Sequence, residues 1–146
     1  MVCFEDIADV ITSELAAKGH PAVLVFNPKT ELKDLKYKIF VFPSDEQRTV
    51  NTRSGSHANQ VTCEIVIGVC RKLSDVENET RQLIKLVRNI GRSYLRRVIC
   101  GCTCHHVQYM PVYDAEQIMD LGEFSGVIKL SFLGFEEEYN GASATA

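Results

Sequence analysis

The stretch that decides the fold class is Val61-Thr62-Cys63-Glu64-Ile65-Val66-Ile67-Gly68-Val69-Cys70. Its odd-numbered residues are all apolar, whereas the even-numbered ones include Thr, Glu and Gly. Successive side chains of a strand point to opposite faces of a sheet, so this alternation is typical of a strand with one buried face. The segment therefore predicts a half-buried β-strand.

Two segments instead carry apolar residues at helical spacing. The first runs from Phe4 to Lys18 and stops at Gly19. The second runs from about Asp75 to Tyr94, after a Ser74-to-Glu77 pattern that predicts a capping box in which Ser74 accepts from the Glu77 amide. Its apolar stripe consists of Val76, Leu83, Val87, Ile90 and Tyr94. Gly91 either costs this helix about 1 kcal/mol or marks an earlier end.

Other apolar runs predict further strands, and Asp114 to Gly122 is expected to form a turn or one short helical turn. These strands are expected at residues 22–26, 37–42, 97–104, 107–113 and 124–135, with Pro43 ending the second of them. The element order favours a single α+β domain over residues 1–139. A mixed, mainly antiparallel sheet would carry two helices on one face, and the tail at 140–146 would be mobile. Whether the strand after the second helix pairs in parallel or antiparallel stays open.

A polar segment, residues 44–60, separates the second and third strands. It is rich in Ser, Thr, Asn, Gly and Arg. Loops this long are uncommon in compact domains and are usually functional or disordered. The segment is therefore expected to be a long polar loop or the turn of a projecting hairpin.

Composition narrows the function classes. The 146-residue chain is 45% hydrophobic and carries a formal net charge of −3, unlike a dedicated nucleic-acid binder, which is usually basic. No apolar run approaches the roughly 20 residues that span a bilayer, and the first residues lack the features of a secretory signal. We expect a protein folded in the cytosol, with reduced thiols and no contact with membranes.

The segment from Cys100 to His106 is the main candidate for chemistry. Thiolate and imidazole are zinc ligands, so Cys100, Cys102, Cys104 and His106 are possible ligands. On one continuous strand, however, the three thiols would share a face at steps of roughly 7 Å, too far apart for one tetrahedral ion. Adjacent Cys104 and His105 would point to opposite faces, which disfavours a Cys–His nucleophile. The preferred interpretation is a strand with small apolar thiols.

Other catalytic patterns are missing from the sequence. It contains no phosphate-binding glycine loop, no dinucleotide-binding fingerprint and no nucleophile elbow. Its acidic residues lie mainly near the chain ends or at helix starts, where they serve solubility and the helix dipole. The sequence thus predicts a protein that assembles rather than an enzyme, with no cofactor.

A basic stripe is predicted along the second helix. Its members recur at intervals of three or four residues: Arg81, Lys85, Arg88, Arg92 and Arg96. If the helix extends that far, they line one side of it, adjacent to the apolar stripe. They could contact phosphates, pair with acids of another subunit, or simply be solvated.

Several blocks of the sequence resemble small tail-completion proteins of tailed bacteriophages. They are Glu31 to Leu35 leading into Ile39 to Pro43, the Ser/Arg-rich Thr52 to Ser56, the strand ending in Arg71-Lys72-Leu73, and the acid-started helix ending in Leu83 to Val87. The resemblance covers about residues 5 to 95. It rests on hydrophobicity and segment length more than on individual side chains, and the Cys-rich strand departs from it.

The resemblance implies a virion protein similar to tail terminators: α/β subunits in a ring, expected to be a homo-hexamer. The ring would cap the tail tube protein, meet the head-side connector or stopper protein, and let DNA pass through its lumen. Arg48, Arg53, Ser54 and His57 of the polar segment would form an interface, and the basic stripe would line the lumen or a subunit contact. Two alternatives stay open: a head–tail stopper or adaptor of the neck, and a small metal- or thiol-dependent protein that uses the Cys100–His106 segment.

Overall fold

The structure is a computed structural model that describes residues 4–26, 37–50, 58–110, 113 and 115–137. Within these residues one mixed sheet has six strands in the order β1-β2-β3-β6-β5-β4. β1 runs parallel to β2, and every other neighbouring pair is antiparallel. The strands are β1 (Ala22–Leu24), β2 (Lys38–Val50), β3 (Ala58–Lys72), β4 (Val98–Ile99), β5 (Cys102–Tyr109) and β6 (Glu123–Glu137). The predicted mixed, mainly antiparallel sheet is therefore confirmed.

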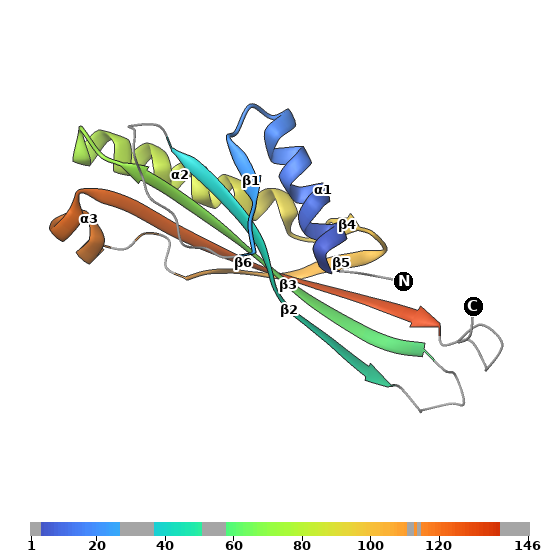
Figure 1. The fold of residues 1–146 in the computed structure, drawn as a ribbon. Coiled ribbons are helices and arrows are strands. Elements are labelled where there is room, and N and C mark those ends of the chain that lie inside the picture. The colour runs from blue at the N-terminus through green and yellow to red at the C-terminus, as the bar shows by residue number, and fades with distance from the viewer. Residues whose placement is uncertain (1–3, 27–36, 51–57, 111–112, 114, 138–146) are drawn as a thin grey trace.

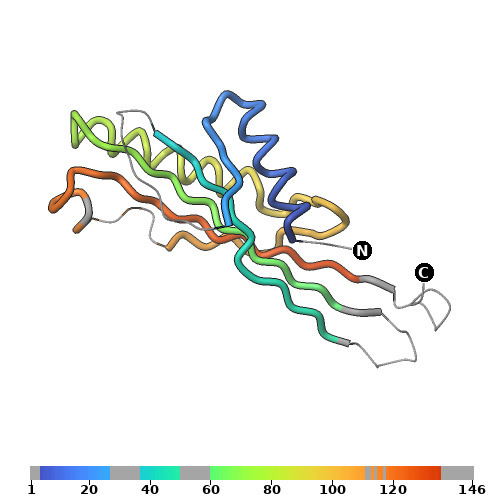
Figure 2. Tube along the Cα trace, in the orientation of Figure 1, coloured from blue at the N-terminus to red at the C-terminus, as the bar shows by residue number. Residues whose placement is uncertain are grey.

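Helices α1 (Phe4–Ala17) and α2 (Val76–Tyr94) lie on one face of this sheet, as the sequence predicts (Figure 1). α1 packs on β1, β2 and β3, whereas α2 packs on β5 and β6. A third helix, α3 (Ala115–Leu121, seven residues), lies just before β6, where the sequence predicts a turn or one short helical turn. The trace in Figure 2 shows α3 at one end of the sheet and the last described residues of β6 at the other.

The core lies between the helices and the sheet. In the alternating segment of β3 from Val61 to Cys70, all five odd-numbered residues are fully buried and the even-numbered residues are not. They pack with Ile7 and Ile11 of α1 and with apolar residues of α2 and β6. Since each fully buried aliphatic side chain contributes roughly 1.5–3 kcal/mol, this alternation is a major determinant of the fold.

The predicted long polar loop is mostly strand. β2 continues through Val50 and β3 already begins at Ala58, so only residues 51–57, outside the described residues, separate them. Of the two interpretations of residues 44–60, the structure supports the projecting hairpin. The ends of β2 and β6 and the start of β3 run on past the helices as a projection, visible in Figure 1 and here called the arm (residues 45–50, 58–64 and 131–137). At its base the arm is still part of the core, since residues 131–133 of β6 pair with β5.

Pro43 does not end the second strand, contrary to the prediction. It lies in β2 opposite Ile65, directly before a register shift between Pro43 and Asp45. β1 pairs with β2 only as far as Val41, so at Pro43 the outer edge of β2 has no described strand beside it. A proline is tolerated at such an edge or bulge because its missing N–H removes no ladder hydrogen bond there.

The single strand predicted over residues 97–104 is also wrong. β4 and β5 form a tight hairpin whose two turn residues, Cys100 and Gly101, have φ of 51° and 78°. β5 then runs on to Tyr109, merging parts of two predicted strands, and pairs antiparallel with β6. This answers the question of direction that the sequence left open.

Candidate functional site

The second helix carries the candidate site, and its first turn is fixed by a polar cluster. Asp75 is the N-cap, and its side chain accepts a hydrogen bond from the Asn78 amide at 3.5 Å. The carboxylate of Glu79 accepts from the Ser74 hydroxyl at 2.6 Å and from the amides of Ser74 and Asp75 at 3.2 Å. The predicted capping box between Ser74 and Glu77 is therefore wrong, since the N-cap is Asp75, one residue later. Ser and Asp are both good N-cap residues, so the sequence alone does not distinguish between the two adjacent positions.

Charge reinforces this cluster. The pKa of the Glu79 carboxyl lies below its usual value. The main cause is the hydrogen bond from the Ser74 hydroxyl, and the two hydrogen bonds from backbone amides act in the same direction. The charge of Arg71, whose Nη2 lies 3.3 Å from Glu79, also contributes. A negative charge at a helix N-terminus also favours the helix dipole. The start of α2 is therefore anchored to the end of β3, which places the rest of the helix.

A close contact with β5 fixes the other half of α2. Gly91 is buried under the ring of Tyr109, whose hydroxyl donates to the carbonyl of Arg88 at 3.2 Å. A Cβ at position 91 would lie 2.5 Å from that hydroxyl oxygen. Gly91 thus neither ends the helix nor merely weakens it: it lets β5 approach.

Four of the five predicted basic residues form an exposed row on α2. Arg81, Lys85, Arg88 and Arg92 are all exposed, while Leu83, Val87 and Ile90 are buried. At 1.5 Å per residue the row spans about 16 Å. No acidic side chain of the described residues lies within salt-bridge distance of the four cations. We call these four residues the cation row.

The fifth residue, Arg96, lies outside the helix. α2 ends at Tyr94, and Arg96 has a left-handed φ of 68° with its amide donating to the carbonyl of Cys104 at 2.8 Å. The predicted stripe is therefore one residue too long. It also faces away from the buried side of α2, rather than lying adjacent to it, because its members fall on the opposite side of the helical wheel.

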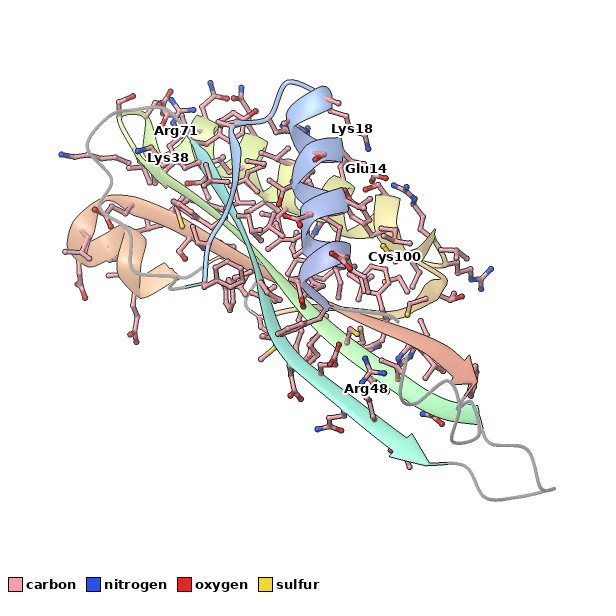
Figure 3. The ribbon with its side chains drawn as sticks, turned by 45° about the vertical axis from the view of Figure 1, so that its right-hand side comes forward. Glu14, Lys18, Lys38, Arg48, Arg71 and Cys100 are labelled. Carbon is pink, nitrogen blue, oxygen red and sulfur yellow. The ribbon has the colours of Figure 1, made fainter. Side chains whose placement is uncertain are left out.

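On the arm, the structure describes one of the four predicted interface residues. Arg48 lies in β2, with its Nε 3.6 Å from Glu46 Oε2, and Figure 3 shows it on the projecting strands. Glu46 also accepts a hydrogen bond from the Phe4 amide at 3.2 Å, so this part of the arm touches the start of α1. Arg53, Ser54 and His57 lie outside the described residues.

The candidate ligands between residues 100 and 106 are separated. Cys100 is exposed in the β4–β5 turn (Figure 3), whereas Cys102 and Cys104 are buried on the helix side of the sheet. His105 lies in a register shift of β5, and His106 is exposed opposite Ser131 of β6. Across the described ranges, no three His, Cys, Asp or Glu side chains are grouped as metal ligands would be.

Thiol electrostatics point the same way. Burial raises the pKa of Cys104, and burial together with the nearby Asp6 carboxylate raises the pKa of Cys100. An activated cysteine needs the opposite shift, because the thiolate is the nucleophile. These two cysteines therefore have the electrostatics of structural thiols, not of catalytic ones.

An apolar hollow between α2 and α3 was not predicted from the sequence. It has a volume of about 360 Å³, with Val76 and Ile84 on the α2 side and Tyr113, Ile118 and Met119 on the α3 side. Arg81, the first residue of the cation row, also lines it. The residues that line the hollow come from two segments that are distant in the sequence, so the sequence does not predict it. Val76, the first residue of the predicted apolar stripe of α2, is exposed there, whereas the other members of the stripe are buried.

No protein-family model matches this sequence, and the comparison with curated proteins finds no match either. No helix among the described residues has the length and apolar character to cross a membrane.

Proposed function

We propose that this chain is a tail terminator of a tailed bacteriophage. Copies of it form a ring, expected to be a hexamer, that caps the tail tube and joins it to the head-side connector in the virion. The observation that carries the proposal is the arm, which extends past the helix layer and so offers strands to a neighbour (Figure 1). The resemblance of residues 5 to 95 to tail-completion proteins supports the same function.

The cation row supports a role in assembly or DNA passage. Four exposed cations without acidic partners in the described part of the chain leave their charge available to another molecule. In a ring, such a row contacts either phosphates of passing DNA or the next subunit. Neither use requires a catalytic group.

The decisive experiment is the particle mass of the purified chain in solution, with negative-stain imaging of its shape. A six-fold ring, alone or on purified tail tubes, is the expected result. A chain that stays a monomer in both settings would contradict the proposal.

A second experiment tests the arm. Replacing residues 51–57 by a Gly-Ser linker of equal length should block tail joining while the domain keeps its thermal stability. The control is a replacement of equal length at residues 27–33, which follow β1 in the sequence, and it should leave joining intact. Equal joining by both variants would remove residues 51–57, which connect two strands of the arm, from the interface.

A head–tail stopper or adaptor would use the same features, since these neighbours are also small and non-catalytic. Binding separates them. A terminator should co-sediment with purified tail tubes, whereas a stopper or adaptor should bind isolated connectors and leave tubes free.

A further inference from the structure

The molecule has an exposed aromatic side chain at one end and an apolar hollow at the other. Phe135 lies near the end of β6, in the arm, and is 62% exposed. The hollow between α2 and α3 adjoins the start of β6, where Tyr113 stacks on Phe124 with ring centroids 6.4 Å apart. Phe135 lies eleven positions after Phe124 in β6, which is about 36 Å along a strand. Figure 1 shows α3 and the arm at opposite ends of the sheet.

Phe135 and the hollow are complementary in polarity and size. The hollow is lined mainly by apolar side chains, and at about 360 Å³ it has room for one aromatic side chain. Met119 beside it is 84% exposed, and Val76 is 46% exposed. Phe135 and the rim of the hollow are therefore both apolar surfaces that are exposed to water in the described fold.

Charge around the two features is complementary as well. Arg81 lines the hollow and begins the cation row, which continues along α2 with Lys85. In the sequence, Phe135 is followed directly by three glutamates at positions 136–138. The sequence thus has an acidic run directly after Phe135, whereas the hollow lies beside a basic row.

We propose that Phe135 of one copy inserts into the α2–α3 hollow of the next copy. The inference rests on the proposed ring and names its subunit contact. A projection and a complementary hollow at different places on one molecule make a head-to-tail contact, which gives a closed ring when the rotation between copies closes. A buried aromatic anchor in an apolar pocket, with charges around it, is the usual centre of such an interface.

Two single variants and their mixture test the contact. Phe135→Ala removes the anchor, and Ala115→Trp fills the hollow from an exposed position on α3. Each should weaken self-association by about tenfold or more. Mixed in equal amounts, the two variants should form a two-chain complex and nothing larger, because each such pair keeps one intact anchor and one open hollow. Native mass spectrometry or sedimentation velocity measures these species.

Two further variants guard the result. Phe26→Ala removes an aromatic side chain that is 74% exposed at the other edge of the sheet, and it should leave the ring intact. Met119→Asp places a negative charge in the apolar hollow, which disfavours burial of an aromatic side chain there, and should behave like Ala115→Trp. Unchanged circular dichroism and melting temperature show that each variant is folded.

The outcomes separate this contact from the ring proposal. A wild-type ring that persists in Phe135→Ala or Ala115→Trp overturns the contact and leaves the ring standing. A mixture without two-chain complexes also overturns it. A wild-type chain that stays monomeric, alone and with tail tubes, overturns both.

Discussion

Glu14 of α1 and Arg97, in the connection between α2 and β4, form a bidentate ion pair. The two guanidinium Nη atoms donate to the two carboxylate oxygens at 2.6 and 2.7 Å, and the guanidinium also lies 5.3 Å from the centre of the Tyr94 ring. These hydrogen bonds and the positive charge of Arg97 lower the pKa of Glu14. The pair ties the first helix to a segment 83 residues later in the chain.

The Glu14–Arg97 pair should make stability depend on pH. A lowered pKa adds stability above the ordinary glutamate value of about 4.3, and this stability is lost as the pH falls through the lowered folded-state value. Glu14→Gln should therefore cost about 1 kcal/mol near pH 7 and lose less stability than the wild type on acidification. Urea unfolding at pH 7 and at pH 3 measures both effects. Asp9→Asn on the same helix is the control, and an equal acid response in Glu14→Gln would contradict the assignment.

The β4–β5 turn should be stabilised by Cys100→Asn. Cys100 holds a φ of 51° before Gly101, a backbone conformation in which Asn-Gly is the preferred pair of a two-residue hairpin. The expected gain is about 0.5 kcal/mol, read as a higher urea midpoint. Cys100→Val is the matched control, because a β-branched residue is strained at positive φ and should destabilise. The opposite order of the two variants would refute the turn geometry.

Gly134→Ala should destabilise the packing between β6 and the start of β5. A Cβ at this buried position of β6 would lie 2.5 Å from Cys102 Sγ and 3.4 Å from Cys102 Cα, so the Cys102 side chain has to move. Overpacking of this kind costs about 1–3 kcal/mol. The double variant Gly134→Ala with Cys102→Ala removes the sulfur and should recover part of that loss. Strictly additive unfolding free energies would show that the two positions do not touch.

Neutralising part of the cation row should leave folding almost unchanged. Arg88 and Arg92 are exposed and have no acidic partner among the described residues, so Arg88→Gln with Arg92→Gln should alter the unfolding free energy by less than about 0.5 kcal/mol. Charge reversal of the same pair to Glu should nevertheless disturb ring assembly or DNA passage. Thermal melting and a joining assay measure the two properties. A large loss of stability would mean that the row serves the fold, and intact assembly would return it to a solvated face.

Cys100 should be the first of the described thiols to react with iodoacetamide. It is exposed, whereas Cys63, Cys102 and Cys104 are buried. Since the Asp6 carboxylate contributes to the raised pKa of Cys100, Asp6→Asn should lower that pKa and speed its alkylation at pH 7.5. Mass spectrometry of timed samples identifies the labelled residue. An unchanged rate would exclude Asp6 as a cause.

Where hydrophobic periodicity is long, the sequence predicts the fold well. The alternation from Val61 to Val69 and the stripe from Leu83 to Tyr94 identify β3 and α2 because burial acts on every second, or every third and fourth, residue. Both helices on one face and the mainly antiparallel sheet follow from the same patterns. Hydrophobic periodicity does not predict the second half of β2, because the residues beyond Pro43 are mainly polar. This part is a strand because it pairs with β3.

Local ambiguities explain the remaining differences. Cysteines at positions 100, 102 and 104 have the spacing of a strand, although Cys100 and Gly101 are the two residues of a turn. Of the candidate site, the sequence predicts four members of the cation row, since helical spacing alone places them. The hollow between α2 and α3 depends on how residues 76–84 and 113–119 meet, and one-dimensional periodicity does not contain that contact.

The pairing of β3 with β6 also determines when the protein can fold. Lys72 pairs with Glu123 and Ala58 pairs with Glu137, so the central ladder joins segments separated by both α2 and the β4–β5 hairpin. During synthesis, β2 and β3 leave the ribosome as a local hairpin long before the strand that completes their sheet. Until residue 137 has emerged, one edge of β3 has no partner strand, and an apolar unpaired edge favours aggregation. The chain therefore completes this core only once β6 has emerged, and truncation before β6 should yield insoluble protein.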